Sequence, residues 1–314
     1  MTAIREHDHG ALTTRAALAS VAVALILLGL KGWAAWSTGS VAVLASLADT
    51  ALDVIASLVT LFGVRVAAMP ADTQHRFGHG KAEAIAALVQ VGIITVSALG
   101  IFWQAVARLI AGDRTVQAEH GIAVSLIAVL LTLALIAYQK SVIRRTGSVA
   151  ISTDRLHYQS DLFLNASVIA ALALDQYAGL TGADPLFGIA IALWLLWNAL
   201  SASRHAVDQL MDREWPEDKR LRFLAVASCR PEAKGIHDLR TRSSGAQDFA
   251  QFHIWVDPAM TVAQAHDIVE AIENDLALEF PGCEVLIHLD PEGQVDHPGD
   301  ILRETDETRE PIPE

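Results

Sequence analysis

The stretch Ala45–Asp53, ASLADTALD, places two carboxylates inside an apolar run that is long enough to cross a membrane. Asp49 and Asp53 are four residues apart, so both lie on one face of a helix. A charge near the middle of a bilayer costs about 2.5–3.5 kcal/mol on insertion scales. The two carboxylates therefore predict a compensating partner, and a helix face that is turned toward a bundle interior or a water-filled cavity.

A second apolar run offers that partner. It opens with Leu156–Asp161, LHYQSD, which places His157 and Asp161 at the same spacing of four residues. Three carboxylates and one imidazole, two ligands from each helix, form a donor set for a tetrahedral divalent-metal site. The alternative is a polar network that ties the two helices together. Three buried acids stabilise such a network poorly unless a cation or protons neutralise them.

The composition predicts a membrane domain joined to a soluble domain. The chain has 314 residues, of which 52% are apolar and 19% are charged, and its mean hydropathy is +0.35. The chain is therefore too hydrophobic for an ordinary soluble domain and too highly charged to lie wholly in the membrane. The net charge of −13 argues against nucleic acid as a partner. The only two cysteines, Cys229 and Cys283, cannot build a disulfide scaffold and are interpreted as packing residues.

Six apolar segments are predicted to form transmembrane helices within a domain over residues 16–211. They are Ala16–Trp36, Val41–Val66, Ala82–Ile110, Gly121–Ser141, Arg155–Leu180 and Pro185–Leu210. Lysine and arginine concentrate on the side that both termini share, and the positive-inside rule places that side in the cytoplasm. We therefore expect a multi-pass protein of the cell inner (plasma) membrane, in contact with lipid. Residues 1–15 are expected to form a disordered cytoplasmic tail, and Lys140–Asp154 a connector.

Residues 212–291 change character and predict a cytoplasmic α+β domain of order αββαβ. The predicted helices are Glu217–Cys229 and Thr261–Phe280, and the predicted strands are Gly235–Ser243, Asp248–Asp257 and Glu284–Asp290. Alternation along the strands predicts that one face of the sheet is apolar and covered by the helices. The acidic, proline-containing tail over 292–314 is expected to be disordered.

Two further clusters outside the membrane carry metal-ligand chemistry. The first is the loop sequence Asp72-x2-His75-x3-His79, which on spacing alone is equally compatible with an exposed polar loop. The second joins residues from three strands and the neighbouring helix, which converge only if the order of strands in the sheet allows it. Its members are His237, His253, His288 and Asp290, with His266 on the helix.

Taken together, these motifs resemble the cation diffusion facilitator family. The resemblance is carried by D-x3-D in the second span, HRFGHGKAE at His75–Glu83, LHYQSD at Leu156–Asp161 and HDLRTRSSG at His237–Gly245. It is closest to the bacterial zinc and ferrous-iron efflux transporters of that family. The resemblance implies a homodimer with six spans per protomer and a metallochaperone-like cytoplasmic domain.

The resemblance also implies a role for each cluster. The implied transport site is Asp49, Asp53, His157 and Asp161. The implied loop site is Asp72, His75 and His79. The implied two-metal cytoplasmic site is His237, His253, His266, His288 and Asp290. Lys81 and Asp212 are implied to form a charge interlock near the dimer interface. Leu289 stands where close relatives commonly have a polar glutamine, which bears on the outer coordination of the cytoplasmic site.

The expected function is efflux of zinc from the cytoplasm in exchange for protons. Oxygen ligands broaden the range of metals that a site accepts, and the resemblance implies that this ligand set also admits cadmium or ferrous iron. Zinc at the cytoplasmic site is expected to regulate the dimer. The alternative is a membrane-bound metal sensor without flux. An intramembrane hydrolase is disfavoured, because the sequence has no H-E-x-x-H motif and no nucleophile placed beside a base. Metal uptake into sealed vesicles separates a transporter from a sensor.

Overall fold

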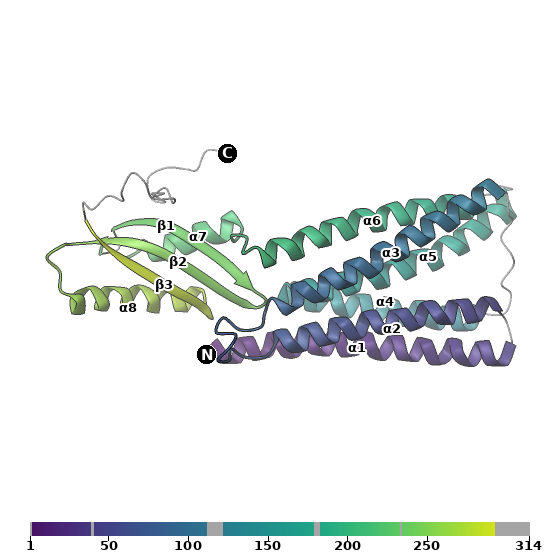
Figure 1. Ribbon diagram of the computed structural model, residues 1–314, viewed down its shortest axis with the longest axis horizontal. Coiled ribbons are helices and arrows are strands. Elements are labelled where there is room, and N and C mark those ends of the chain that lie inside the picture. Colours follow the sequence, from purple (N-terminus) through teal and green to yellow (C-terminus); the bar gives the residue numbers. More distant parts are fainter. Residues whose placement is uncertain (1, 39–40, 112–121, 179–182, 233, 293–314) are drawn as a thin grey trace. The chain divides into compact units, whose positions relative to one another are not determined.

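The structure is a computed structural model of the chain, and it describes residues 2–38, 41–111, 122–178, 183–232 and 234–292 (Figure 1). The chain divides into two compact units. One comprises residues 8–208, and the other comprises residues 1–7 together with 209–314. Of the predicted tail over 292–314, residues 293–314 lie outside the described residues.

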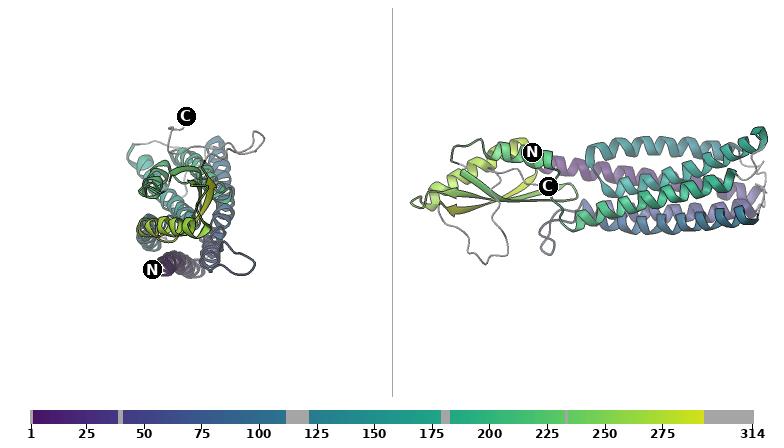
Figure 2. Two further views of the ribbon diagram at one scale, coloured as in Figure 1. Left: turned by 90° about the vertical axis from the view of Figure 1, so that its left-hand side faces the viewer. Right: turned by 90° about the horizontal axis from the view of Figure 1, so that it is seen from above.

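Long helices build the first unit, and they run alongside one another in both side views (Figures 1 and 2). They are α1 (Thr2–Thr38), α2 (Val41–Ala67), α3 (Ala82–Ala111), α4 (Ile122–Thr146), α5 (Val149–Ala178) and α6 (Ala183–Leu210). Among the described residues, five of them contain a stretch that is long and apolar enough to cross a membrane: α1, α2, α3, α4 and α6. The remaining helix, α5, has 30 residues, but polar residues such as Asp154 and Asp161 interrupt its apolar run. Length therefore fits six spans, while composition alone identifies five.

The polar lead before Ala16 is helical, and the expectation of a disordered tail there is wrong. Helix α1 begins at Thr2. Starting a helix is the costly step and extending it adds one hydrogen bond per residue. The apolar span therefore serves as the nucleus, and no proline stands between Thr2 and Ala16 to stop the helix.

The predicted connector Lys140–Asp154 is mostly helical, which is a second correction. Helix α4 continues to Thr146 and α5 starts at Val149. Gly147 adopts a positive φ of 65° and its N–H donates to Ile143 O at 2.7 Å, which ends α4. Ser148 Oγ then accepts from the N–H of Ile151 at 3.3 Å and caps α5. The break is thus two residues long, and the polar residues after it belong to α5.

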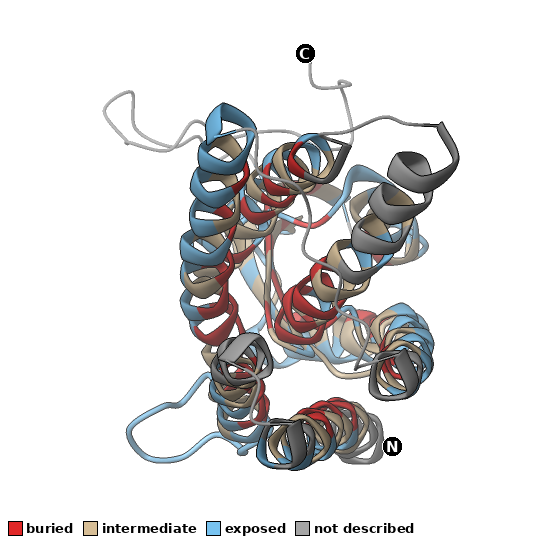
Figure 3. Ribbon diagram, turned by 90° about the vertical axis from the view of Figure 1, so that its right-hand side faces the viewer, coloured by how far each residue is buried: buried red, intermediate tan, exposed pale blue. Residues whose placement is uncertain are grey.

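The buried residues lie on the faces that the helices turn toward one another (Figure 3). One apolar cluster joins α1, α2, α4 and α5, and another joins α3, α5 and α6. Helices α2 and α3 approach closely at Gly63, where a Cβ would lie 2.2 Å from the Cβ of Ala86. On the outer faces, Phe62, Trp103 and Trp197 are exposed by 73%, 77% and 73%. Large apolar side chains exposed in this way suit contact with lipid rather than water.

The second unit is a three-stranded sheet with two helices. Its elements are α7 (Glu217–Ala227), β1 (Lys234–Ser244), β2 (Gln247–Val256), α8 (Val262–Glu279) and β3 (Cys283–Pro291). The strand order is β1-β2-β3, with β1 antiparallel and β3 parallel to β2. A parallel pair needs a crossover, and α8 supplies it. Thr261 and Gln264 form a capping box at the start of α8.

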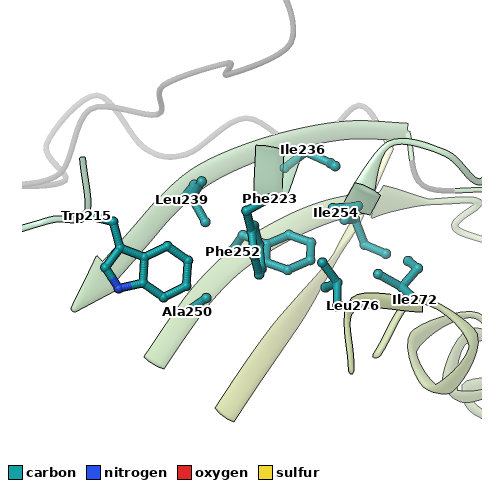
Figure 4. Close-up of a cluster of buried hydrophobic side chains, with 10 residues drawn as sticks. Trp215, Phe223, Ile236, Leu239, Ala250, Phe252, Ile254, Ile272 and Leu276 are labelled. Carbon is teal, nitrogen blue, oxygen red and sulfur yellow. The ribbon is translucent and has the colours of Figure 1, made fainter. Parts of the chain in front are cut away.

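The core of this unit lies between the helices and one face of the sheet (Figure 4). Phe223 of α7 is fully buried and meets Phe252 of β2 edge-on, with ring centroids 5.8 Å apart. Ile272 and Leu276 of α8 cover the same core. The expected αββαβ order and the helix-covered apolar face are confirmed.

Strand β1 carries an irregularity that alternation did not predict. Its register with β2 shifts on both sides of His237, and Asp238 has a positive φ of 50°. Ile236 and Leu239 both belong to the apolar core although they are three residues apart. A bulge at this point inserts an extra residue. Ile236 and Leu239 therefore both reach the core, although strict alternation would place them on opposite faces of the sheet.

Candidate metal-binding sites

The acidic and imidazole side chains of α2 and α5 converge inside the first unit. His157 Nε2 lies 3.0 Å from Asp53 Oδ1, and one ligand atom from each of Asp53, His157 and Asp161 lies within 4.8 Å of the others. His157 is buried, and the two carboxylates are half-buried. Two ligands of a tetrahedral zinc ion bonded at about 2.1 Å lie ~3.4 Å apart. The distance between His157 Nε2 and Asp53 Oδ1 is therefore already close to the spacing that such an ion requires.

The fourth member of the predicted quartet, Asp49, lies one turn before Asp53 on α2. Its side chain is outside the part of the chain that the structure describes. Neighbouring polar residues on α2 are engaged with other helices. Lys31 Nζ of α1 donates to Thr50 Oγ1 at 2.7 Å, and the hydroxyls of Ser57 and Tyr158 lie 2.8 Å apart. Thr50, Asp53 and Ser57 of α2 thus face the interior of the bundle.

The loop between α2 and α3 brings together Asp72, His75 and His79. Asp72 Oδ1 lies 3.4 Å from His75 Nδ1, and its Oδ2 lies 3.5 Å from His79 Nε2. The backbone N–H of His75 donates to Asp72 Oδ1 at 2.6 Å, and that of Gln74 at 2.8 Å. These two bonds hold the pKa of Asp72 below its usual range. The loop therefore offers an ionised carboxylate between two imidazoles, and the three residues of the expected cluster lie together in space.

The cytoplasmic cluster forms on the sheet face opposite the core. His237 lies opposite His253 in the β1–β2 ladder, and His253 lies opposite His288 in the β2–β3 ladder. Asp290 is the common partner. Its carboxylate oxygens lie 3.3 Å from His237 Nε2, 2.8 Å from His253 Nδ1 and 3.4 Å from His288 Nε2. The strand order thus satisfies the condition that the sequence left open.

Three predicted residues stand outside these clusters. His266 is exposed on α8, and within the described protomer no contact joins it to the cytoplasmic cluster. Asp212 Oδ1 lies 3.7 Å from Arg242 Nη1. Lys81 belongs to the first unit and Asp212 to the second, so their interlock stays a prediction.

Sequence reasoning missed two buried acids. Asp154 of α5 is fully buried, and Glu83 of α3 is 7% exposed. Glu83 stands within a motif quoted above, but its hydrogen-bond partner lies 65 positions away. Ser148 Oγ donates to Glu83 Oε2 at 2.7 Å, which joins the start of α3 to the start of α5. The signal for Asp154 was its position three residues before His157, which places it on the ligand-bearing face.

Comparison with known proteins agrees with this architecture. A family model described as the cation efflux transmembrane domain matches residues 17–211, and one described as the cation efflux protein cytoplasmic domain matches residues 216–292. The chain is 42% identical over 299 residues to the cation-efflux pump FieF of Cronobacter sakazakii, covering 93% of this chain and 99% of that protein. It is 45% identical over 286 residues to the pump of the same name in Serratia proteamaculans, covering 91% and 95%. The solved metal-bound C-terminal domain of the CzcD transporter from Thermotoga maritima is 29% identical, covers 25% of this chain and 93% of its own, and gives a TM-score of 0.24.

A transmembrane helical domain with acidic and imidazole side chains grouped in its interior, followed by a small cytoplasmic domain, is the architecture of a membrane transporter for cations. The chain belongs to the cation efflux family, which is the cation diffusion facilitator family that its motifs resemble. The predicted family and fold class are thereby confirmed.

Proposed function

We propose that this protein exports zinc from the cytoplasm in exchange for protons, through a site formed by Asp49, Asp53, His157 and Asp161. The observation that carries the proposal is the 3.0 Å approach of His157 Nε2 on α5 to Asp53 Oδ1 on α2 inside the helical bundle. The relatives named cation-efflux pumps support it. Two ligands from each helix make the site sensitive to any relative movement of α2 and α5.

Proton exchange follows from the chemistry of the ligands. An imidazole binds metal through a lone pair that protonation removes, and a carboxylate binds metal in its ionised form. Metal loading therefore expels protons, and protons that arrive from the opposite side favour release. His157 is the natural exchanger, since an unperturbed imidazole titrates near ~6.5. With one nitrogen and three oxygen donors, the set also admits cadmium or ferrous iron.

The basic residues and the cytoplasmic domain support the topology that we propose. Both termini lie in the cytoplasm, so the cytoplasmic cluster meets metal before export. The protein forms a homodimer in the inner membrane, as the match to the cytoplasmic domain of cation efflux proteins supports. Zinc bound at His237, His253, His288 and Asp290 draws the two acidic domains together and regulates transport. It does so by favouring one arrangement of the dimer.

The test is metal flux in reconstituted vesicles. With an inwardly directed proton gradient, wild-type protein is expected to move zinc in the opposite direction, and Asp161→Ala is expected to abolish this flux while the dimer persists. Thr60→Ala is the control, because Thr60 is buried on α2 and, within the described parts of the chain, its hydroxyl donates only to Ala56 O of its own helix. Undiminished flux in Asp161→Ala refutes the site assignment. Zinc binding without flux by wild-type protein refutes transport and favours the membrane-bound sensor.

A further inference from the structure

A buried carboxylate one turn before His157 belongs to none of the metal-binding clusters. Asp154 of α5 accepts hydrogen bonds from three other helices. Ser20 Oγ of α1 donates to its Oδ2 at 2.6 Å, Gln90 Nε2 of α3 donates to its Oδ1 at 2.8 Å, and Gln139 Nε2 of α4 donates to its Oδ2 at 2.7 Å. Ser20, Gln90, Gln139 and Asp154 are all fully buried. We call these four residues the Asp154 hub.

The two glutamines are committed to Asp154 at a cost. Each amide turns its N–H toward the carboxylate, and among the described groups the Oε1 atoms of Gln90 and Gln139 are buried without a hydrogen-bond partner. A buried polar atom left unpaired costs about 1–3 kcal/mol. Buried ionisable groups also add little to stability between helices, and well-packed apolar residues often replace them without loss of stability. The hub therefore calls for an explanation beyond holding the bundle together.

The geometry of α5 supplies that explanation. Asp154, His157 and Asp161 stand at positions i, i+3 and i+7, so they share one helix face. Turning α5 about its axis by one residue, about 100°, carries His157 away from Asp53 and also breaks the bonds to Asp154. The hub thus fixes the same rotational setting that the transport site requires. It does so from α1, α3 and α4, none of which carries a predicted ligand of that site.

We propose that Asp154 is a positioning residue for transport, and that its hydrogen bonds to Ser20, Gln90 and Gln139 orient α5 so that His157 and Asp161 face the ligands of α2. The proposal rests on the transport site proposed above. It assigns to Asp154 no metal bond, because both of its oxygens are engaged by side-chain donors. The essential property of the residue is its hydrogen-bonding geometry, and not its charge.

Two substitutions of Asp154 separate geometry from charge. Asp154→Ala removes the three hydrogen bonds that end on the carboxylate. Asp154→Asn removes the charge but keeps an oxygen for Ser20 and Gln139, and its N–H group can donate to the unpaired Oε1 of Gln90 once that amide turns over. The proposal therefore predicts that the alanine variant is impaired and that the asparagine variant is rescued.

Two measurements on the full-length protein report the setting of the site. The first is the visible absorption of bound cobalt(II), which is intense only in tetrahedral coordination. It is taken as the difference between each variant and the same variant carrying Asp53→Ala. The second is the KM for zinc in vesicles. Replacing a residue that orients metal ligands typically costs about 10- to 100-fold in affinity. Asp154→Ala is expected to raise KM by that factor and to lose the tetrahedral band, while Asp154→Asn keeps both at wild-type values.

The matched control is Thr153→Ala. Thr153 is buried next to Asp154, but its hydroxyl donates to Val149 O of its own helix and, among the residues that the structure describes, to no other helix. It is expected to leave KM and the cobalt band unchanged. If Asp154→Ala does not fold, Ser20→Ala replaces it, because this change removes one donor of the hub and is expected to weaken the band.

Each outcome decides the proposal. An unchanged cobalt band in folded Asp154→Ala overturns it. Equal impairment of Asp154→Asn and Asp154→Ala also overturns it, since charge would then be the essential property. A fall in folded protein and Vmax at constant KM assigns Asp154 a structural role only. Failure of the transport site itself is distinguishable, because wild type and Asp53→Ala then give the same cobalt spectrum.

Discussion

Asp290 is the residue on which the cytoplasmic histidines converge, so its removal tests that cluster most sharply. The carboxylate lies 3.3 Å from His237 Nε2, 2.8 Å from His253 Nδ1 and 3.4 Å from His288 Nε2. These spacings are near the ~3.4 Å that separates two ligands of a tetrahedral zinc ion. Asp290→Ala removes the only anionic donor of the cluster and leaves the imidazoles in place.

The size of the effect has a lower bound. Removing a group that merely orients a ligand costs about 10- to 100-fold in metal affinity. A direct anionic donor is expected to cost at least the larger factor, which corresponds to about 2.7 kcal/mol at 1.36 kcal/mol per factor of ten. Calorimetric titration of the purified full-length protein with zinc should therefore lose its cytoplasmic component in Asp290→Ala.

The regulatory consequence is measurable through a native cysteine. Cys229 is exposed, whereas Cys283 is partly buried and burial raises the pKa of its thiol to about 12. The thiolate is the form of cysteine that attacks a thiol-reactive spin label, so near neutral pH the label is directed to Cys229. Zinc is expected to shorten the distance between the labels of the two protomers in wild type and to leave it unchanged in Asp290→Ala.

The control for Asp290→Ala is Glu279→Ala, which removes the same charge from an exposed residue in the last turn of α8. It should keep both the zinc titration and the distance change. If Asp290→Ala binds zinc with wild-type affinity, the convergence of histidines on this carboxylate is not a metal site. If it loses zinc but the labels still approach, the cluster binds metal without regulating the dimer.

Three further predictions concern stability. Arg230 Nε donates to Asp275 Oδ2 at 2.6 Å, and this bond holds the pKa of Asp275 below its usual range. The pair therefore stabilises the fold above about pH 4 and loses its effect as pH falls through the lowered pKa, so the fall in Tm caused by Arg230→Gln should be constant between neutral and mildly acidic pH and should shrink in stronger acid. Gly63→Ala brings a methyl group 2.2 Å from Ala86 Cβ and should destabilise the protein by about 1–3 kcal/mol, with recovery in the double variant with Ala86→Gly, as measured by thermal unfolding in detergent; no recovery would contradict the packing of α2 on α3. Phe223→Ala empties a fully buried position and should cost the cytoplasmic unit about 3–5 kcal/mol, measured by urea unfolding; a cost near zero would contradict the core of Figure 4.

Most element boundaries could be predicted from the sequence because local rules set them. The predicted spans Val41–Val66 and Ala82–Ile110 end within one residue of α2 and α3. Long apolar runs leave the backbone no alternative to the helix inside a membrane. In the soluble unit, Ser244-Gly245 and Pro281-Gly282 mark the strand ends closely, since turns need residues that tolerate their backbone angles.

The errors arose where polar residues interrupt an apolar pattern. The lead before Ala16 and the stretch before Arg155 carry charges, and this pattern predicts non-helical segments. The first is helical and the second is helical except at residues 147–148, since a helix extends cheaply from an apolar nucleus. The carboxyl oxygens of Asp154 accept hydrogen bonds from donors 15, 64 and 134 residues away. No local window contains those partners.

The sequence by itself determined which residues share a helix face, because i, i+4 spacing is a property of the helix alone. It thereby identified Asp53, His157 and Asp161 as possible ligands. Only the tertiary structure decided that α5 turns His157 to within 3.0 Å of Asp53 and that Asp154 meets three other helices. It also decided that parallel pairing of β3 brings Asp290 to the histidines. Distances between elements depend on how whole faces pack, and many residues set that packing jointly.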